Sequence, residues 1–139
     1  MKFTLTQEYK INLLLGVFVT VLVGMNLLGT KVVTILGIST SVAIFMYPIS
    51  FLITDIIEEV FGPKLARQFV AVGIFAIVLT FLFATLFVAL PPAERYTSND
   101  AYTTVFMQSL RIGIASVVAF IVAQLHDVWA FNFWKEKTH

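Results

Sequence analysis

Four long apolar runs limit this chain to very few folds. They lie at about 11–28, 42–61, 65–90 and 104–131, and each can cross roughly 30 Å of hydrocarbon as a helix. Of the 139 residues, 59% are hydrophobic and only 12% are charged, whereas a soluble domain carries about a quarter charged residues. The sequence therefore predicts an all-α integral membrane protein, a single domain over 1–139 with four transmembrane helices.

The connections between the runs are short. Gly62-Pro63 predicts a tight joint, because glycine ends one helix and proline opens the next. Pro91-Pro92 ends the third run, and a polar loop follows. The segment 31–41 is short, β-branched and broken by Gly37, so both an external hairpin and a re-entrant piece remain open.

The positive charges predict the orientation. Cytoplasmic loops of membrane proteins carry the excess of Lys and Arg. One side holds two cations, Lys31 and Arg95. The other side holds six, which are Lys2, Lys10, Lys64, Arg67, Lys135 and Lys137. We therefore expect the N-terminus in the cytoplasm, with the first run retained as a helix although it resembles a signal peptide.

The second run ends in three carboxylates, those of Asp55, Glu58 and Glu59. Positions three and four apart are neighbours on a helix, so Asp55 lies beside both glutamates. Carboxylates at the C-terminal end of an apolar helix oppose the helix dipole and are costly in a membrane. Either the helix ends there in water or the acids have a function, and Asp55 is the least compatible with a surface position.

A seam of small and polar residues runs along the fourth helix at alternating steps of four and three residues. This spacing keeps one face toward a partner helix, and small side chains permit close approach in lipid. The seam consists of Ser109, Gly113, Ser116, Phe120, Ala123 and Asp127, with Gln124 beside its end. We expect Asp127 at the depth of the acidic cluster, and Asn26, Lys31 and Arg111 toward the opposite side.

Other chemistries find little support. The chain has no cysteine, which excludes thiol chemistry and disulfides. Its two histidines are not spaced for a metal site, and it contains neither a glycine-rich phosphate loop nor the basic cluster of a nucleic-acid-binding protein. We expect no enzyme activity, no cofactor, no bound metal and no nucleic-acid partner.

Three sequence blocks resemble the queuosine precursor transporter family, which is also described as a vitamin uptake transporter family. The first is 26–31 (NLLGTK), the second is 47–62 (YPISFLITDIIEEVFG) with Ala66-Arg67 after it, and the third runs from Arg111-Ile112 to Phe131. The most specific part of the resemblance is Thr54-Asp55 with Glu59 and Gly62. The third block includes Ser116, Ala119-Phe120, Gln124 and Asp127.

The resemblance implies a multi-pass importer in the bacterial inner membrane for 7-deazaguanine bases, the precursors of queuosine. It implies a bundle of about six helices, of which this chain resembles the first part, so that the chain is a truncated form. The candidate partners are a small-molecule substrate and the lipid bilayer, with a homo-oligomer left open.

A 7-deazaguanine presents an N1–H and an amino group on one edge, and a carboxylate accepts both. Glu59 or Asp55 is the leading candidate for this role, with Asn26 serving the carbonyl edge and Phe51 stacking on the ring. The full set of candidate substrate-binding residues is Asn26, Lys31, Phe51, Thr54, Asp55, Glu58, Glu59, Arg111, Gln124 and Asp127.

Three other functions remain as alternatives. The first is the substrate-binding membrane subunit of a vitamin importer that works with a separate energy-coupling ATPase. The second is a structural subunit of a larger membrane complex. The third, an intramembrane enzyme that uses Asp55 and Glu58 as an acid–base pair, has neither a nucleophile nor a metal. Carboxylates in a membrane also suit a proton relay, so the driving force is left open.

Overall fold

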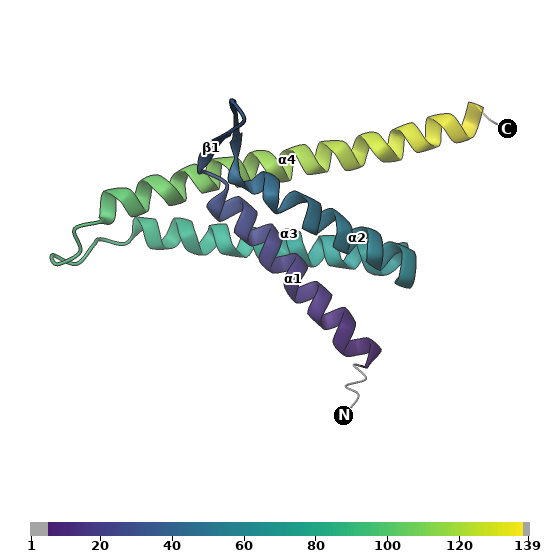
Figure 1. The fold of residues 1–139 in the computed structure, drawn as a ribbon, viewed down its shortest axis with the longest axis horizontal. Coiled ribbons are helices and arrows are strands. Elements are labelled where there is room, and N and C mark those ends of the chain that lie inside the picture. The colour runs from purple at the N-terminus through teal and green to yellow at the C-terminus, as the bar shows by residue number, and fades with distance from the viewer. Residues whose placement is uncertain (1–5, 138–139) are drawn as a thin grey trace.

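Four α-helices make up most of the molecule (Figure 1). The computed structural model describes residues 6–137, with side chains described for 6–119. The helices are α1 (Gln7–Leu28), α2 (Tyr47–Phe61), α3 (Pro63–Ala89) and α4 (Asn99–Lys137). Between α1 and α2 lie the strands β1 (Val32–Ile35) and β2 (Ile38–Ser41) and a 3-10 helix, η1 (Val42–Phe45).

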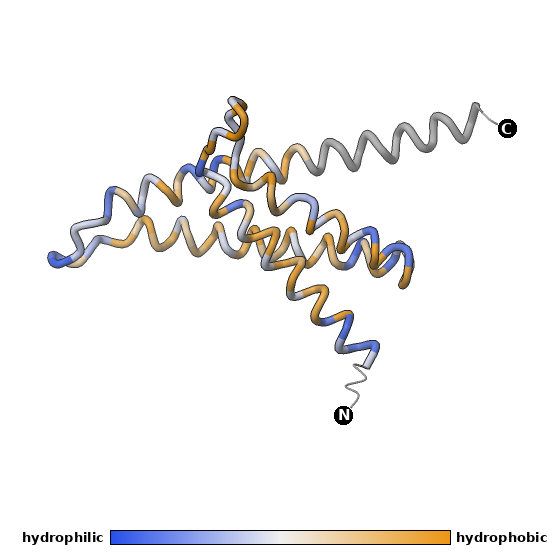
Figure 2. Tube along the Cα trace, in the orientation of Figure 1, coloured by the Kyte–Doolittle hydropathy of each residue, from blue (hydrophilic) through white to orange (hydrophobic). Residues whose placement is uncertain are grey.

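Two of the described helices, α1 and α3, are long and apolar enough to cross a membrane. Their most apolar segments reach mean hydropathies of 2.2 and 2.7. Figure 2 shows the hydrophobic colour along both helices, and it shows polar residues at the ends of α2 and α3 and in the loops. Helix α2 has 15 residues, which is about 22 Å at 1.5 Å per residue and too short to span alone. The predicted helical class therefore holds for the described residues, and the count of four spans stays a prediction.

The second apolar run, 42–61, is not one continuous helix. It divides at Met46 into η1 and α2. Pro48 lacks the N–H that would continue an α-helical ladder back to Ile44, and it is tolerated in the first turn of α2, where that N–H would be unpaired. The fourth helix also differs from its predicted bounds, because it begins five residues earlier, at Asn99, and continues to Lys137.

The joint at Gly62-Pro63 confirms the prediction of a tight connection. Gly62 has φ 89° and ψ 166°, a conformation that a side chain would strain. Its N–H donates to the carbonyl of Glu58 at 3.0 Å, and Pro63 is the first residue of α3. The joint turns α3 back along α2.

The core lies where α1, α2 and α3 meet. Phe18 from α1 packs against Phe69 from α3 with ring centroids 6.0 Å apart. Ile53 and Ile57 of α2 close this cluster, and Ile57 is completely buried. Because Ile53 and Ile57 are four residues apart, they fix which side of α2 faces the bundle.

The segment 31–41 forms a β-hairpin, and its position relative to the membrane stays a prediction. Strands β1 and β2 pair antiparallel from Val32 opposite Ser41 to Ile35 opposite Ile38. Leu36 and Gly37 form the turn with φ values of 50° and 83°, as a two-residue hairpin turn requires. Leu36 is 98% exposed, and Figure 1 shows the hairpin projecting from the helices. This hairpin is the one departure from an all-α fold within the described residues.

The hairpin is tied to the end of α1 by Ser41. Its hydroxyl donates to the carbonyl of Gly29 at 2.6 Å and accepts from the N–H of Ala43 at 3.1 Å. It thus satisfies a carbonyl just beyond α1 and an N–H at the start of η1, as capping side chains do.

We expect Ser41→Ala to lower the free energy of unfolding by about 1–2 kcal/mol, because it removes both bonds at once. Thermal unfolding of the protein in detergent measures this change. Ser39→Ala is the matched control, since Ser39 is exposed and its hydroxyl makes one exposed hydrogen bond, with the hydroxyl of Thr34 at 3.3 Å. Equal melting temperatures for the two variants would show that the cap does not stabilise the fold.

Candidate functional site

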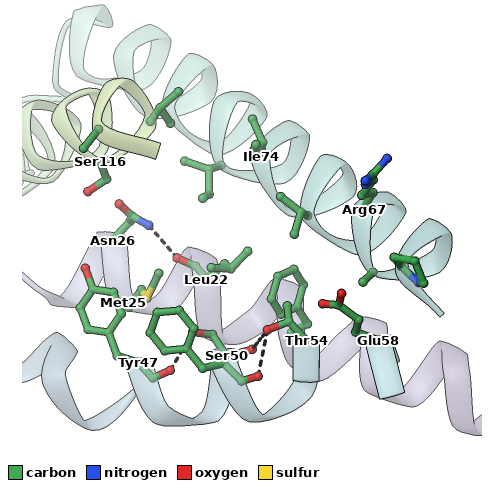
Figure 3. A pocket seen from close by; sticks show the side chains of 18 residues that line it. Leu22, Met25, Asn26, Tyr47, Ser50, Thr54, Glu58, Arg67, Ile74 and Ser116 are labelled. Carbon is green, nitrogen blue, oxygen red and sulfur yellow. Dashed lines mark hydrogen bonds between the residues drawn. The ribbon is translucent and has the colours of Figure 1, made fainter. Parts of the chain in front are cut away.

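A cavity of about 750 Å³ lies between the four helices (Figure 3). Its volume is in the range of small-molecule sites, which are about 300–1,000 Å³. Each helix contributes to the wall. The lining residues are Phe18, Leu22, Met25 and Asn26 of α1; Tyr47, Ser50, Phe51, Thr54 and Glu58 of α2; Pro63, Ala66, Arg67, Val70, Ile74 and Ile77 of α3; and Ser116, Val117 and Ala119 of α4.

Helix α2 presents one continuous stripe to the cavity. The stripe consists of Tyr47, Ser50, Phe51, Thr54 and Glu58. Each of them has another member three or four residues away, the spacing that shares one side of a helix. The buried isoleucines of the core fix the rotation of α2 and so turn this stripe toward the cavity. It combines aromatic rings, hydroxyls and a carboxylate.

The two aromatic residues of the stripe lie one helical turn apart and pack on each other. The rings of Tyr47 and Phe51 are stacked, with centroids 6.3 Å apart and planes inclined by 20°. Phe51 is 62% exposed and Tyr47 is 43% exposed, so both rings retain free faces. Such rings can stack on a planar ligand.

Polar groups gather at one end of the cavity from α1 and α4. Asn26 is only 4% exposed, and its Nδ2 donates to the carbonyl of Leu22 at 2.9 Å. Ser116 of α4 lies nearby with its hydroxyl directed toward the same region (Figure 3), and that hydroxyl donates to the carbonyl of Ile112 at 2.9 Å.

Charged groups stand at the other end, beside the joint between α2 and α3. Glu58 points inward from α2, and Arg67 lies on α3 at the same end, with no hydrogen bond between them (Figure 3). Glu58 is eight residues from Ser50, about 12 Å along the helix. The cavity therefore has a charged end and a neutral polar end, with the two aromatic rings between them.

Four of the candidates predicted from the sequence line this cavity: Asn26, Phe51, Thr54 and Glu58. All three acids of α2 are exposed, but Asp55 and Glu59 do not line the cavity. They are four residues apart and so share a different face of α2.

The remaining candidates lie elsewhere. Lys31 is exposed at the base of the hairpin, and its carbonyl accepts from the N–H of Val42 at 3.0 Å. Arg111 lines a second cavity of about 480 Å³ with Thr30, Gln108, Ile112 and Ala115. The side chains of Gln124 and Asp127 are outside the described part of the chain.

Tyr47, Ser50, Arg67 and Ser116 line the cavity but were not among the substrate-binding residues predicted from the sequence. The three- and four-residue spacing from Tyr47 through Ser50 to Thr54 and Glu58 was a usable signal, because it mixes hydroxyls with an aromatic residue along one face of an apolar helix. Arg67 carried a weaker signal, since its charge also suited a position outside the membrane.

Known proteins resemble this chain over most of its length. The chain is 33% identical over 132 residues to the "Queuosine precursor transporter" of Escherichia coli (strain K12), covering 94% of this chain and 58% of the relative. It is 34% identical over 108 residues to the "Probable queuosine precursor transporter" of Bacillus subtilis (strain 168), covering 77% of this chain and 47% of the relative.

A third relative with the same name, from Haemophilus influenzae, is 32% identical over 87 residues, which is 62% of this chain and 35% of the relative. The chain thus spans about half the length of the curated relatives it matches. No solved structure matches it. The relatives are named as transporters, consistent with a membrane protein that is not an enzyme.

Residues 41–139, which include α2, α3 and α4, match the model of the family described as "Putative vitamin uptake transporter". This match covers well over half of the chain and three of the four helices that line the cavity. The chain therefore belongs to this family of membrane transporters, in which its named relatives are queuosine precursor transporters.

Proposed function

We propose that this protein imports 7-deazaguanine bases, the precursors of queuosine, across the bacterial inner membrane. The observation that carries the proposal is the cavity between the four helices. A 7-deazaguanine is flat, and the stacked rings of Tyr47 and Phe51 offer a matching surface. Three relatives named as queuosine precursor transporters support the choice of substrate.

Glu58 is the carboxylate that the geometry favours for recognition of the base. It is the acid that lines the cavity among the three on α2. A carboxylate accepts two hydrogen bonds side by side, which matches the N1–H and amino group on one edge of 7-deazaguanine. Bonds to a charged acceptor are also stronger than neutral ones.

We propose a multi-pass arrangement in one domain with the N-terminus in the cytoplasm and four spans, of which η1 and α2 together form the second, over 42–61. The six cations on the N-terminal side of the predicted loops support this orientation. The charged end of the cavity, at Glu58 and Arg67, then lies toward the cytoplasm, and Asn26 lies deeper in the bilayer. A transporter must open such a site to one side at a time.

Uptake of radiolabelled 7-deazaguanine tests the proposal directly. We expect cells that lack their own importer, and cannot make the base, to accumulate it only when they carry this protein. An importer-deficient strain with an empty vector measures background entry. Uptake at the background level, with the protein present in the membrane, would contradict the proposed function.

The family description, "Putative vitamin uptake transporter", favours vitamin uptake as a second candidate function. The chain would then act as a vitamin-binding membrane subunit that works with a separate ATPase. The same cavity would hold a flat heterocyclic vitamin. In that case uptake requires a partner ATPase, and reconstituting the purified protein alone in vesicles gives none. Accumulation of 7-deazaguanine by vesicles that hold only this protein would exclude the second candidate.

A further inference from the structure

Arg111 is the only lysine or arginine in the predicted fourth span, 104–131. It lies about 10 Å along the helix from the outer end of that span, the end opposite the side of the N-terminus. A charge at this depth is costly in lipid unless an opposite charge or water accompanies it. Asp100 and Asp127 are about 16 Å and 24 Å away by helix rise, so the acids of α4 are too distant to pair with the guanidinium.

The second cavity, of about 480 Å³, lies where α4 passes the end of α1 at the base of the hairpin (Figure 1). Gln108 lines it one turn nearer the outer end of α4 than Arg111, and Thr30 lines it from the turn after α1. None of the described residues that line this cavity is acidic. Lys31 is exposed next to Thr30 and brings a second positive charge to the same region. The cavity is therefore suited to an anion.

The carbonyl groups at the end of α1 already have donors without Arg111. A cation near a helix C-terminus often serves these carbonyls and the negative end of the helix dipole. Here the carbonyl of Leu28 accepts from the N–H of Lys31 at 3.2 Å, and that of Gly29 accepts from the hydroxyl of Ser41 at 2.6 Å. A guanidinium has five N–H donors, and the capping of α1 leaves them for a ligand.

One side of α4 changes from polar to apolar in the direction of the bilayer centre. Gln108, Arg111, Ala115 and Val118 follow one another at three or four residues, the spacing that shares one side of a helix. Ala115 lines the cavity, and Val118 is 55% exposed. A charged, hydrogen-bonding end followed by an exposed apolar strip has the same order as the head group and acyl chain of a lipid in the outer leaflet.

We propose that this second cavity binds the phosphate of an anionic phospholipid, whose acyl chain lies along Ala115 and Val118. Arg111 holds the phosphate, because its planar guanidinium makes two parallel hydrogen bonds to phosphate oxygens. Gln108 and Thr30 bind the polar groups of the lipid beside the phosphate. The inference rests on the proposed multi-pass arrangement and is independent of the transported substrate. It also separates Arg111 from the substrate-binding residues with which the sequence grouped it.

Native mass spectrometry of the purified full chain in an uncharged detergent measures the binding of single lipid molecules. We expect the first phosphatidylglycerol to bind with a Kd about tenfold or more below that of phosphatidylethanolamine, whose amine offsets the phosphate charge. Arg111→Gln is expected to raise the Kd of phosphatidylglycerol about tenfold and remove this preference. Arg95→Gln is the matched control, because it removes the same charge from an exposed position in the loop before α4 and should leave both Kd values unchanged.

Equal Kd values for the two lipids, or equal effects of Arg111→Gln and Arg95→Gln, would overturn the inference and leave Arg111 as a side chain that reaches water. Inorganic phosphate distinguishes the other source of the same chemistry. A large molar excess of it is expected to leave phosphatidylglycerol bound, because a free anion gains nothing from the apolar strip. Displacement of the lipid by inorganic phosphate would assign the cavity to a free anion and overturn the lipid assignment.

A second variant assigns lipid binding to the cavity without removing the charge. Ala115→Leu fills the space beside Arg111 and is expected to raise the Kd of phosphatidylglycerol about tenfold. Ala101→Leu is its control, because Ala101 is exposed on the first turn of α4 and does not line the cavity. Equal Kd values for these two variants would overturn the inference. Lipid binding as expected in a protein that imports no 7-deazaguanine would contradict the proposed function and leave this inference standing.

Discussion

Replacing Glu58 with glutamine is expected to lower uptake of 7-deazaguanine by about tenfold to a hundredfold. The substitution keeps the shape of the side chain but replaces one acceptor oxygen by an NH₂ donor. That donor would face the donor edge of the base, so one hydrogen bond is lost and a repulsive contact takes its place. The initial rate of uptake at low substrate concentration, in cells with equal amounts of protein in the membrane, measures the loss.

Glu59→Gln makes this experiment decisive because the two acids are adjacent in the sequence but face different ways. Both substitutions remove one charge from the same end of α2, so a general effect of charge on membrane insertion would appear in both. We expect the larger loss for Glu58, which lines the cavity. A larger loss for Glu59 would show that the family motif, and not the cavity, identifies the carboxylate that binds the base.

The contrast between these two glutamates shows what the sequence could predict about the site. The spacing predicted that Asp55, Glu58 and Glu59 lie at one end of one helix, and the structure has them there. The side to which each acid points depends on the rotation of α2, which the packing of Ile53 and Ile57 against α1 and α3 decides. That packing involves residues far apart in the sequence, so local spacing could not reveal it.

The fold was easier to predict than the site. Long apolar runs predict helices because a backbone in lipid must satisfy its own hydrogen bonds, and Gly62-Pro63 predicts a joint because of the conformations these two residues favour. The sequence leaves the form of the segment 31–41 open, since β-branched residues suit several structures. Its form depends on Leu36 adopting a positive φ, which a leucine seldom does.

The seam on α4 illustrates a prediction that the described residues confirm in part. Ser109 is completely buried, and its one hydroxyl proton lies between two carbonyls, that of Val105 on its own helix at 2.9 Å and that of Leu27 on α1 at 3.0 Å. Gly113 is also buried, against α3. One turn further on, Ser116 leaves the packing contact and lines the cavity. The same small residues that allow the helices to approach thus also leave room for the site.

Gly113→Ala is expected to destabilise the bundle by about 1–3 kcal/mol. A Cβ at this position would overlap the edge of the Phe81 ring on α3, and both residues are buried. Because lipid offers no hydrophobic force between helices, close packing is what holds α3 against α4. Thermal unfolding and the fraction of monodisperse protein in detergent measure the loss.

Gly16→Ala provides a control with the opposite sign. A Cβ on Gly16 has no neighbour within 4 Å, so alanine there adds only its better helix propensity, about 0.5–1 kcal/mol in favour of the fold. If Gly113→Ala lowers the stability of the protein and Gly16→Ala raises it, the loss at Gly113 comes from the contact with Phe81 and not from a general effect of replacing a helical glycine. Equal shifts at both positions would contradict the crowding.

Phe81→Leu tests the origin of the effect, because leucine lacks the ring edge that alanine at position 113 would strike. Alone, Phe81→Leu leaves a void and destabilises the bundle. Combined with Gly113→Ala, it makes space for the new methyl group, so the double variant is expected to be more stable than the sum of the two single effects. Strictly additive effects would show that the ring of Phe81 does not limit the approach of α4. Since α4 supplies Ser116 and Val117 to the cavity wall, 7-deazaguanine binding should recover with stability in the double variant.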